Sequence, residues 1–245
     1  MTRSRRTSSE GTVTSKPMET DLTAPASGLW SRRIGAIVTV RGPLGKEYRG
    51  RVLRVDGETA VVRAFEEIPF PAESPLSLTL VQAIPKKEKM GFIVEKATEL
   101  GVERIIPCLS ARSALAHERD WQDKSHRWPE IARRAVGQCR RRVVPVVSPW
   151  VSLTEAVASF SSISARKLIL YEKEKLVRLR DIVEAEKPSE SVIIVCGPEG
   201  GFTDDEVASA VSTGFVPVSL GGRVLRCETA ALAALSVVQC AWGDL

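Results

Sequence analysis

The chain has 245 residues, of which 43% are hydrophobic and 27% charged, with a formal net charge of +5. This length can bury one large core or two modest ones, and the composition is typical of a soluble globular protein. No apolar run is long enough to cross a membrane and no signal core opens the chain, so we expect a cytoplasmic protein without membrane contact. The modest positive charge permits nucleic-acid binding, but only its distribution can argue for it.

The five cysteines do not support a disulfide framework or a zinc site, because they are odd in number, dispersed and without C-x-x-C spacing. They are Cys108, Cys139, Cys196, Cys227 and Cys240. We interpret them as reduced core thiols and expect no metal. His117 and His126 lie in a polar loop without matching ligands and are interpreted as surface residues.

Residues 1–30 are predicted to be a disordered tail, because Met1–Gly28 is rich in Ser, Thr, Arg, Pro and Glu and almost lacks bulky apolar side chains. Apolar runs then alternate with turn signals. Asp56-Gly57 is a strong hairpin signal ahead of a return strand over Thr59–Phe65. Residues 31–72 are therefore expected to form a small antiparallel barrel or meander.

Apolar strands and amphipathic helices alternate over residues 75–245, which predicts an α/β domain with a mostly parallel sheet covered on both faces. Strands are expected at Leu76–Ile84, Arg104–Cys108, Lys167–Tyr171, Val192–Cys196 and Phe215–Leu220. Helices are expected from Lys89, from Trp128, from Thr203 and over Ser152–Phe160, Lys175–Glu186 and Glu228–Gln239. Two of these helix starts carry capping boxes, Ser152 with Glu155 and Thr203 with Glu206.

Two glycine-rich loops follow strands near the C-terminus. One is Gly197-Pro198-Glu199-Gly200-Gly201 and the other begins at Gly221-Gly222. Loops at strand carboxyl ends suit a ligand held by backbone groups, and the acids Asp204 and Asp205 that follow disfavour phosphate. On these residues alone, a tight turn in any α/β domain explains the loops about as well as a cofactor site does.

Arginines gather around the helix that starts at Trp128. They are Arg133, Arg134, Arg140, Arg141 and Arg142. A solvated charged face is the usual explanation of such a run. Because no acid is interspersed among them, we favour a patch that contacts the phosphate backbone of a nucleic acid.

The two glycine loops taken together are more specific. GPEGGFTDDEV, LGGRVLRCETAALAAL and the terminal WGDL resemble the ribosomal RNA small-subunit methyltransferase E family, the 16S rRNA uridine-N3 methyltransferases of the SPOUT (α/β-knot) superfamily. KMGFIVEKATELGVERIIP is a second matching block. The resemblance departs at the N-terminus, where a family segment that opens the small domain does not appear in Met1–Trp30. This departure implies a lost barrel strand or an unusual start of the gene product.

The resemblance implies a PUA-like, OB-related RNA-binding domain over residues 31–72, apparently shortened, and a C-terminal SPOUT domain with a trefoil knot over residues 75–245. It implies transfer of a methyl group from S-adenosylmethionine (SAM) to N3 of a specific uridine in 16S rRNA of the small ribosomal subunit. It also implies a homodimer through the C-terminal domain, and the helix over Glu228–Gln239 agrees because it is apolar almost all round.

Site residues follow from the same resemblance. SAM contacts are expected at Gly197, Pro198, Glu199, Gly200, Gly201, Leu220, Gly221, Leu225 and Thr229. Arg226 and Glu228 are the expected catalytic residues: Arg226 would stabilise a uracil oxygen or orient the base, and Glu228 would fix the loop. RNA contacts are expected at Lys89, Lys96, Arg112, Arg140, Arg141 and Arg142. For Lys96, a solvated helix face is an equal alternative. Cys227 is interpreted as a core-compatible residue rather than a nucleophile, because N3 methylation needs no covalent intermediate.

Two other classes of function stay open. A Rossmann-type nucleotide-binding enzyme is disfavoured, because no G-x-G-x-x-G opens the first βα unit. The other is a SPOUT-fold RNA-binding or ribosome-assembly protein, either without activity or with another rRNA or tRNA nucleotide as its target. The intact glycine loops argue against loss of activity.

Overall fold

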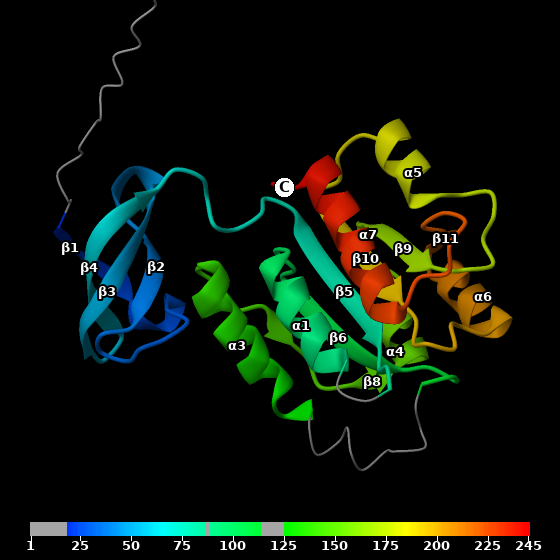
Figure 1. The fold of residues 1–245 in the computed structure, drawn as a ribbon, viewed down its shortest axis with the longest axis horizontal. Coiled ribbons are helices and arrows are strands. Elements are labelled where there is room, and N and C mark those ends of the chain that lie inside the picture. The colour runs from blue at the N-terminus through cyan, green and yellow to red at the C-terminus, as the bar shows by residue number, and fades with distance from the viewer. Residues whose placement is uncertain (1–18, 87–88, 114–124) are drawn as a thin grey trace, which may run out of the picture.

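The computed structural model describes residues 19–86, 89–113 and 125–245, which form two units joined by a linker (Figure 1). The first unit is a four-stranded antiparallel sheet in the order β1-β4-β3-β2. Its strands are β1 (Thr20–Pro25), β2 (Ile37–Arg41), β3 (Glu47–Asp56) and β4 (Thr59–Ile68). The predicted hairpin is confirmed, because β3 and β4 pair on either side of Gly57, whose φ is +59°. Buried residues such as Val38 and Val62 give this unit its own core.

Strand β1 corrects the prediction that residues 1–30 form a disordered tail. It pairs with β4 from Thr20 opposite Ala64 to Pro25 opposite Thr59. Its buried side chains are small, such as Ala24, so the segment lacks the bulky apolar pattern that predicts a strand. The strand is defined instead by its pairing with residues about 40 positions away. Residues 1–18 of the predicted tail lie outside the described residues.

The second unit is a seven-stranded sheet in the order β11-β9-β10-β5-β6-β7, with β8 also on β6, and every pairing in it is parallel. The strands are β5 (Ser77–Ala83), β6 (Arg104–Leu109), β7 (Val146–Val147), β8 (Val151–Ser152), β9 (Arg166–Leu170), β10 (Ser191–Cys196) and β11 (Val216–Val218). The α/β class with a mostly parallel sheet is therefore confirmed. No helix in the described ranges is long and apolar enough to cross a membrane.

Helices cover both faces of this sheet. On one face the core includes α1 (Lys89–Glu99), α3 (Trp128–Cys139), α5 (Leu179–Ala185) and α7 (Cys227–Trp242). On the other it includes α4 (Leu153–Ala158) and α6 (Asp204–Ser212). Along β5, Leu78 and Leu80 join the first cluster and Val81 and Ala83 join the second, so this central strand is buried on both faces. Both predicted capping boxes are present, at the starts of α4 and α6.

The helix predicted over Lys175–Glu186 is shorter than expected, because α5 begins only at Leu179. The preceding residues bond to the sheet instead: Ser219 donates its N–H to the carbonyl of Val177 and accepts from the N–H of Leu179, each at 2.9 Å. The carboxylate of Glu174 also accepts from the N–H groups of Leu176 and Val177. These bonds hold the segment in a turn that helical pattern alone does not show.

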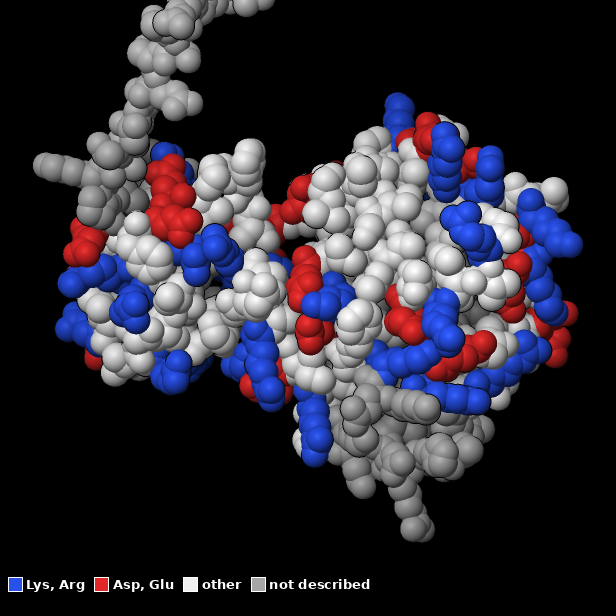
Figure 2. All heavy atoms as spheres, in the orientation of Figure 1, with Lys and Arg blue, Asp and Glu red and all other residues white. Residues whose placement is uncertain are grey.

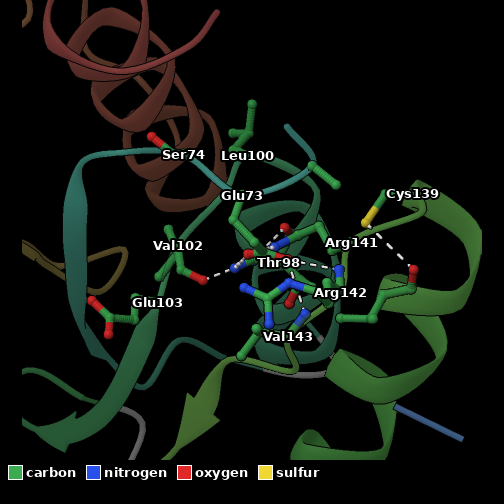
Figure 3. A network of polar contacts seen from close by, with 12 residues as sticks. Glu73, Ser74, Thr98, Leu100, Val102, Glu103, Cys139, Arg141, Arg142 and Val143 are labelled. Atoms are coloured by element: carbon green, nitrogen blue, oxygen red, sulfur yellow. Dashed lines mark hydrogen bonds and ion pairs between the residues drawn. The ribbon is translucent and has the colours of Figure 1, made fainter. Parts of the chain in front are cut away.

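Arg141 is buried, which corrects the prediction that it contacts RNA phosphates. Only 5% of the residue is exposed, and its Nε and Nη2 donate to one carboxylate oxygen of Glu73 at 3.0 and 2.8 Å (Figure 3). Its Nη1 donates to the carbonyls of Thr98 and Val102, at the C-terminal end of α1, at 3.0 and 2.8 Å. A guanidinium with its donors committed in this way is part of the core.

We expect Arg141→Ala to lower the free energy of unfolding by about 3 kcal/mol or more, because the Glu73 carboxylate and two carbonyls lose their donor. Urea denaturation measures this loss. Arg180→Ala is the control, since Arg180 forms an exposed pair with Glu184 within α5 and its removal costs less than about 1 kcal/mol. Equal losses in the two variants would show that the Arg141 cluster is not a structural anchor.

Candidate active site

The glycine loops meet at the carboxyl edge of the parallel sheet. The first, residues 197–201, follows β10, and the second, residues 219–226, joins β11 to α7. The segment that follows β5 reaches the same edge and leads to α1. Because carboxyl ends of parallel strands lie together, loops distant in the chain become neighbours here.

A lysine ties these segments together. The ammonium of Lys89, at the start of α1, lies 3.0 Å from a carboxylate oxygen of Glu199 and 3.1 Å from one of Glu228. Glu199 belongs to the first loop and Glu228 to the first turn of α7. The N–H of Lys86 donates to both carboxylate oxygens of Glu199, at 3.0 and 3.3 Å. Three chain segments are thus joined at one point.

The charges in this cluster are stabilised by one another. The hydrogen bond to Glu199 raises the pKa of Lys89, burial opposes it, and the bond to Glu228 raises it further. Burial raises the pKa of Glu199, but the N–H of Lys86 and the Lys89 ammonium outweigh burial and hold the pKa below its usual value. Burial also raises the pKa of Glu228, but its own backbone N–H, the Cys227 thiol and the Lys89 ammonium outweigh burial and lower that pKa. At neutral pH, Lys89 is therefore a cation and both glutamates are anions.

Cys227 does not have the properties of a nucleophile. Burial, followed by the hydrogen bond that its thiol donates to Glu228 at 3.1 Å, raises the pKa of Cys227 to about 12. The thiolate needed for attack is therefore scarce at neutral pH. This finding agrees with its interpretation as a core-compatible residue.

The first glycine loop accepts hydrogen bonds from Arg112. Its Nη1 donates to the carbonyls of Gly200 and Phe202 at 2.8 and 3.3 Å. A Cβ at Gly200 would lie 3.1 Å from the Cβ of Arg112, and one at Gly201, whose φ is +66°, would lie 2.5 Å from a carboxylate oxygen of Glu172. Gly201 therefore suits only glycine, and a side chain at Gly200 would have to displace Arg112. Arg112, predicted to contact RNA, supports the loop in this structure.

The second glycine loop leaves its backbone open. Within the described residues, no hydrogen bond involves the N–H or C=O groups of residues 221–225. Gly221 has φ of +110°, a conformation in which side chains are strained. Arg226 follows as the N-cap of α7, and in the described part of the chain its exposed guanidinium has no hydrogen bond or ion pair. Free backbone donors and acceptors thus lie beside a free cation.

The remaining predicted residues lie in three places. Thr229 lies beside Lys89 and Glu228 in an open groove between α1 and α7, which also contains Phe92 and Leu232. Lys96 lies in a different groove, between α1 and α3, where hydrogen bonds to Glu95 and Glu99 raise its pKa. Arg140 and Arg142 lie at the boundary between the two units. On the face shown in Figure 2, basic and acidic side chains are interspersed.

Gln82 was missed by sequence reasoning. It is fully buried at the end of β5, and its Nε2 donates to the carbonyls of Ala83, Cys196 and Gly197 at 2.9, 3.4 and 3.3 Å. This amide therefore ties β5 to the start of the first glycine loop. A polar residue inside the apolar run of Leu76–Ile84 was the available signal. Among the described residues, no group of three or more His, Cys, Asp or Glu is placed to hold a metal.

Known proteins resemble this chain over most of its length. Residues 72–239 match the family model of the RNA methyltransferase domain. The chain is 30% identical over 195 residues to the ribosomal RNA small subunit methyltransferase E of Buchnera aphidicola subsp. Acyrthosiphon pisum, covering 79% of this chain and 75% of the relative. It is 37% identical over 172 residues to the protein of the same name from Mycobacterium bovis, covering 69% and 64%.

Two solved structures are similar over almost the whole chain. The ribosomal RNA small subunit methyltransferase E from Neisseria gonorrhoeae bound to SAM has a TM-score of 0.67 and 32% identity, over 92% of this chain and 94% of that one. A putative methyltransferase from Legionella pneumophila in complex with SAM has a TM-score of 0.65 and 34% identity, over 94% and 96%. By sequence and by structure, the chain belongs to the ribosomal RNA small subunit methyltransferase E family.

Proposed function

We propose that this protein transfers a methyl group from SAM to N3 of a uridine in 16S rRNA of the small ribosomal subunit. The observation that carries the proposal is the pair of glycine loops joined through Lys89, in a chain whose relatives are named small-subunit rRNA methyltransferases. A similar protein from Neisseria gonorrhoeae was crystallised with SAM. The substrate is therefore ribosomal RNA and the cofactor is SAM.

The residues of the second glycine loop fit this cofactor. SAM carries an adenine edge and ribose hydroxyls that both donate and accept hydrogen bonds, and the backbone groups of residues 221–225 are free to serve them. Gly200 and Gly201 in the first loop lack side chains, so backbone can approach a ligand closely. The residues that would hold SAM are Gly197, Pro198, Glu199, Gly200, Gly201, Leu220, Gly221, Leu225 and Thr229. When bound, SAM supplies an electrophilic methyl group for in-line transfer.

The protein must stabilise the uridine that receives the methyl group. N3 of uracil becomes nucleophilic when it loses its proton, and the negative charge then spreads to the two carbonyl oxygens. The free guanidinium of Arg226 is suited to stabilise that charge. Glu228 is held by Lys89 and by the Cys227 thiol, so its role is to fix the start of α7 beside Arg226. The base must also be unpaired to reach this edge of the sheet.

RNA contacts are proposed for Lys89, Lys96, Arg112 and Arg140. Arg141 is withdrawn because it is buried, and Arg142 is withdrawn because its Nε is bonded to the buried Glu47 at the boundary between the units. We further propose that the N-terminal sheet is the PUA-like, RNA-binding barrel of the family. The C-terminal segment would form the trefoil knot, with α7 passing through a loop that precedes it. A crystal structure with SAM bound would trace this passage, and a path of α7 outside every loop would contradict it.

A homodimer through the C-terminal unit is supported by the outer face of α7. Side chains on this face and on neighbouring α1 are exposed although apolar, with Val237 36% and Phe92 47% exposed. Leu232 and Ala233 line the groove between the two helices. An area without charged side chains lies over α7 in Figure 2. We propose that a second copy of this chain covers this area.

The proposed reaction is tested by mass spectrometry of 16S rRNA. Small subunits from a strain lacking this gene, incubated with the protein and SAM carrying a labelled methyl group, are expected to gain one methyl at N3 of a single uridine. Arg226→Ala should lower kcat by about 100-fold with SAM affinity intact, as for loss of one charge-stabilising donor. Arg180→Ala should behave as the unchanged protein. A methyl on another atom or another RNA contradicts the proposed product.

The cofactor site is tested by calorimetry with SAM. Gly200→Val and Gly221→Val should abolish binding: the first crowds Arg112, and the second strains a loop with φ of +110°. Gly57→Val is a matched control, because Gly57 also has a positive φ of +59° but lies in the N-terminal hairpin. If both folded variants bind SAM as the wild type does, the loops are not the cofactor site.

The dimer is tested by analytical sedimentation. The wild type should sediment as a dimer at micromolar concentration, and Val237→Glu should produce monomers because it places a charge on the covered face of α7. Val211→Glu on α6 is the control, since Val211 is 47% exposed on a helix of the opposite face. A monomeric wild type would refute the homodimer.

A further inference from the structure

The turn that follows α3 is the junction between the two units. Arg140 ends the helix with φ of +69°, a left-handed conformation that reverses the chain. Its carbonyl accepts a hydrogen bond of 2.7 Å from Oγ1 of Thr39, which lies on β2 and is 2% exposed. A backbone group of the methyltransferase unit is thus bonded to a buried side chain of the N-terminal sheet.

The next two arginines reach in opposite directions. Arg141 enters the methyltransferase unit, whereas Nε of Arg142 donates to a carboxylate oxygen of Glu47 on β3 at 3.3 Å. Glu47 is 4% exposed, and its other oxygen accepts from the N–H of Ala72 in the linker at 2.8 Å. Arg41 of the same sheet reaches Glu47 at 3.5 Å. The buried carboxylate therefore joins the sheet, the linker and the turn.

Glu73, also in the linker, holds the turn from its other side. One carboxylate oxygen accepts from the guanidinium of Arg141, and the second accepts from the N–H groups of Arg142 and Val143 at 2.6 and 2.8 Å (Figure 3). All these donors come from three consecutive residues. The linker is thereby fixed to the end of α3 rather than free to rotate.

A third point of contact lies one helical turn earlier. A Cβ at Gly137 would lie 2.8 Å from the ring of Trp30, so the indole packs directly against the helix backbone. The carbonyl of Trp30 accepts from Nη1 of Arg133 at 3.0 Å. Thr39, Glu47 and Trp30 come from separate segments of the N-terminal unit. Domains joined by a linker move relative to one another by default. Three separate contacts to the end of α3 restrict the orientation of the N-terminal unit relative to the methyltransferase unit.

We propose that Glu47 and Arg142 form a clasp that positions the N-terminal sheet, and the rRNA bound to it, relative to the cofactor loops. The inference rests on the proposed function, to which it adds two positioning residues. Glu47 is too buried to touch RNA and its oxygens are engaged. Without Arg142 the buried carboxylate keeps only Arg41 and the N–H of Ala72, both on its own side of the boundary, and without the Glu47 charge Arg142 loses its partner on the sheet. The sheet then loses its fixed orientation while both units stay folded.

The test combines a distance with steady-state kinetics. Spin labels on keto-bearing amino acids replace Glu58 and Lys187, which are exposed and have no side-chain hydrogen bond or ion pair in the described residues. They report the separation of the two units and leave the native cysteines unlabelled. Labelled protein is diluted with unlabelled protein so that only distances within one chain are measured. In the wild type the distance distribution should be narrow. Glu47→Gln and Arg142→Gln should broaden it, and Arg180→Gln should leave it narrow.

The kinetic readout separates positioning from general damage. For Glu47→Gln and Arg142→Gln, KM for small ribosomal subunits should rise about tenfold, equivalent to about 1.4 kcal/mol of binding. Their kcat and SAM affinity should stay within about twofold of wild type, the pattern of lost binding without lost chemistry. Arg142→Lys keeps the charge and should restore part of the KM. Loss of kcat together with SAM binding would indicate only structural damage and overturn the clasp.

Two further results would overturn the clasp alone. Distances that stay narrow in both variants would show that the contact does not set the orientation. Broadened distances with an unchanged KM would show that the orientation does not matter to RNA. A wild-type protein that binds SAM but methylates no small subunits would instead overturn the proposed function, whatever the distances show.

Discussion

Parallel pairing of the seven-stranded sheet is the constraint on which the candidate active site depends. β10 and β11 are not adjacent, since β9 lies between them, yet their loops end at the same edge because all three strands run in one direction. The segment after β5 reaches that edge for the same reason. Lys89 then links Glu199 to Glu228 across these segments, so one ammonium joins loops that are almost 30 residues apart. The parallel sheet brings these segments together, and the ion pairs of Lys89 hold them in place.

Burial decides what each arginine does in this chain. Arg180 pairs with Glu184 on the exposed side of α5, where solvent screens the charges and the pair contributes little. Arg141 pairs with Glu73 in a site that is almost fully buried, where all three of its guanidinium nitrogens donate hydrogen bonds and the pair anchors the linker. Arg226 is exposed and has no partner among the described residues, which is the state expected of a group that meets a ligand. Side-chain type alone distinguishes none of these roles.

The two units are joined by polar contacts rather than by a shared apolar core. The N-terminal sheet has its own buried cluster, separate from those on the two faces of the large sheet. Across the boundary run the bonds of Thr39, Glu47 and Glu73 to the turn after α3, with Trp30 packed on Gly137. Such contacts are directional, so they set an angle as well as a distance. A defined angle between the two units would help a protein that must bring a bound RNA to a cofactor.

Local pattern was enough to predict the α/β class, the β3–β4 hairpin, both capping boxes and the two glycine loops. These features depend on residues within a few positions of one another, such as Thr203 with Glu206, so their signal is complete in a short segment. Features that depend on residues far apart in the chain could not be predicted from local pattern. β1 was missed because it is defined by its pairing with β4. α5 was predicted too long because Ser219 forms hydrogen bonds with the backbone of Val177 and Leu179. Gln82 was overlooked because its three carbonyl partners come together only in the folded sheet. Arg141 shows the reason most clearly: three arginines in a row look alike as sequence, and only tertiary packing decides which of them faces water, which reaches the other unit and which enters the core.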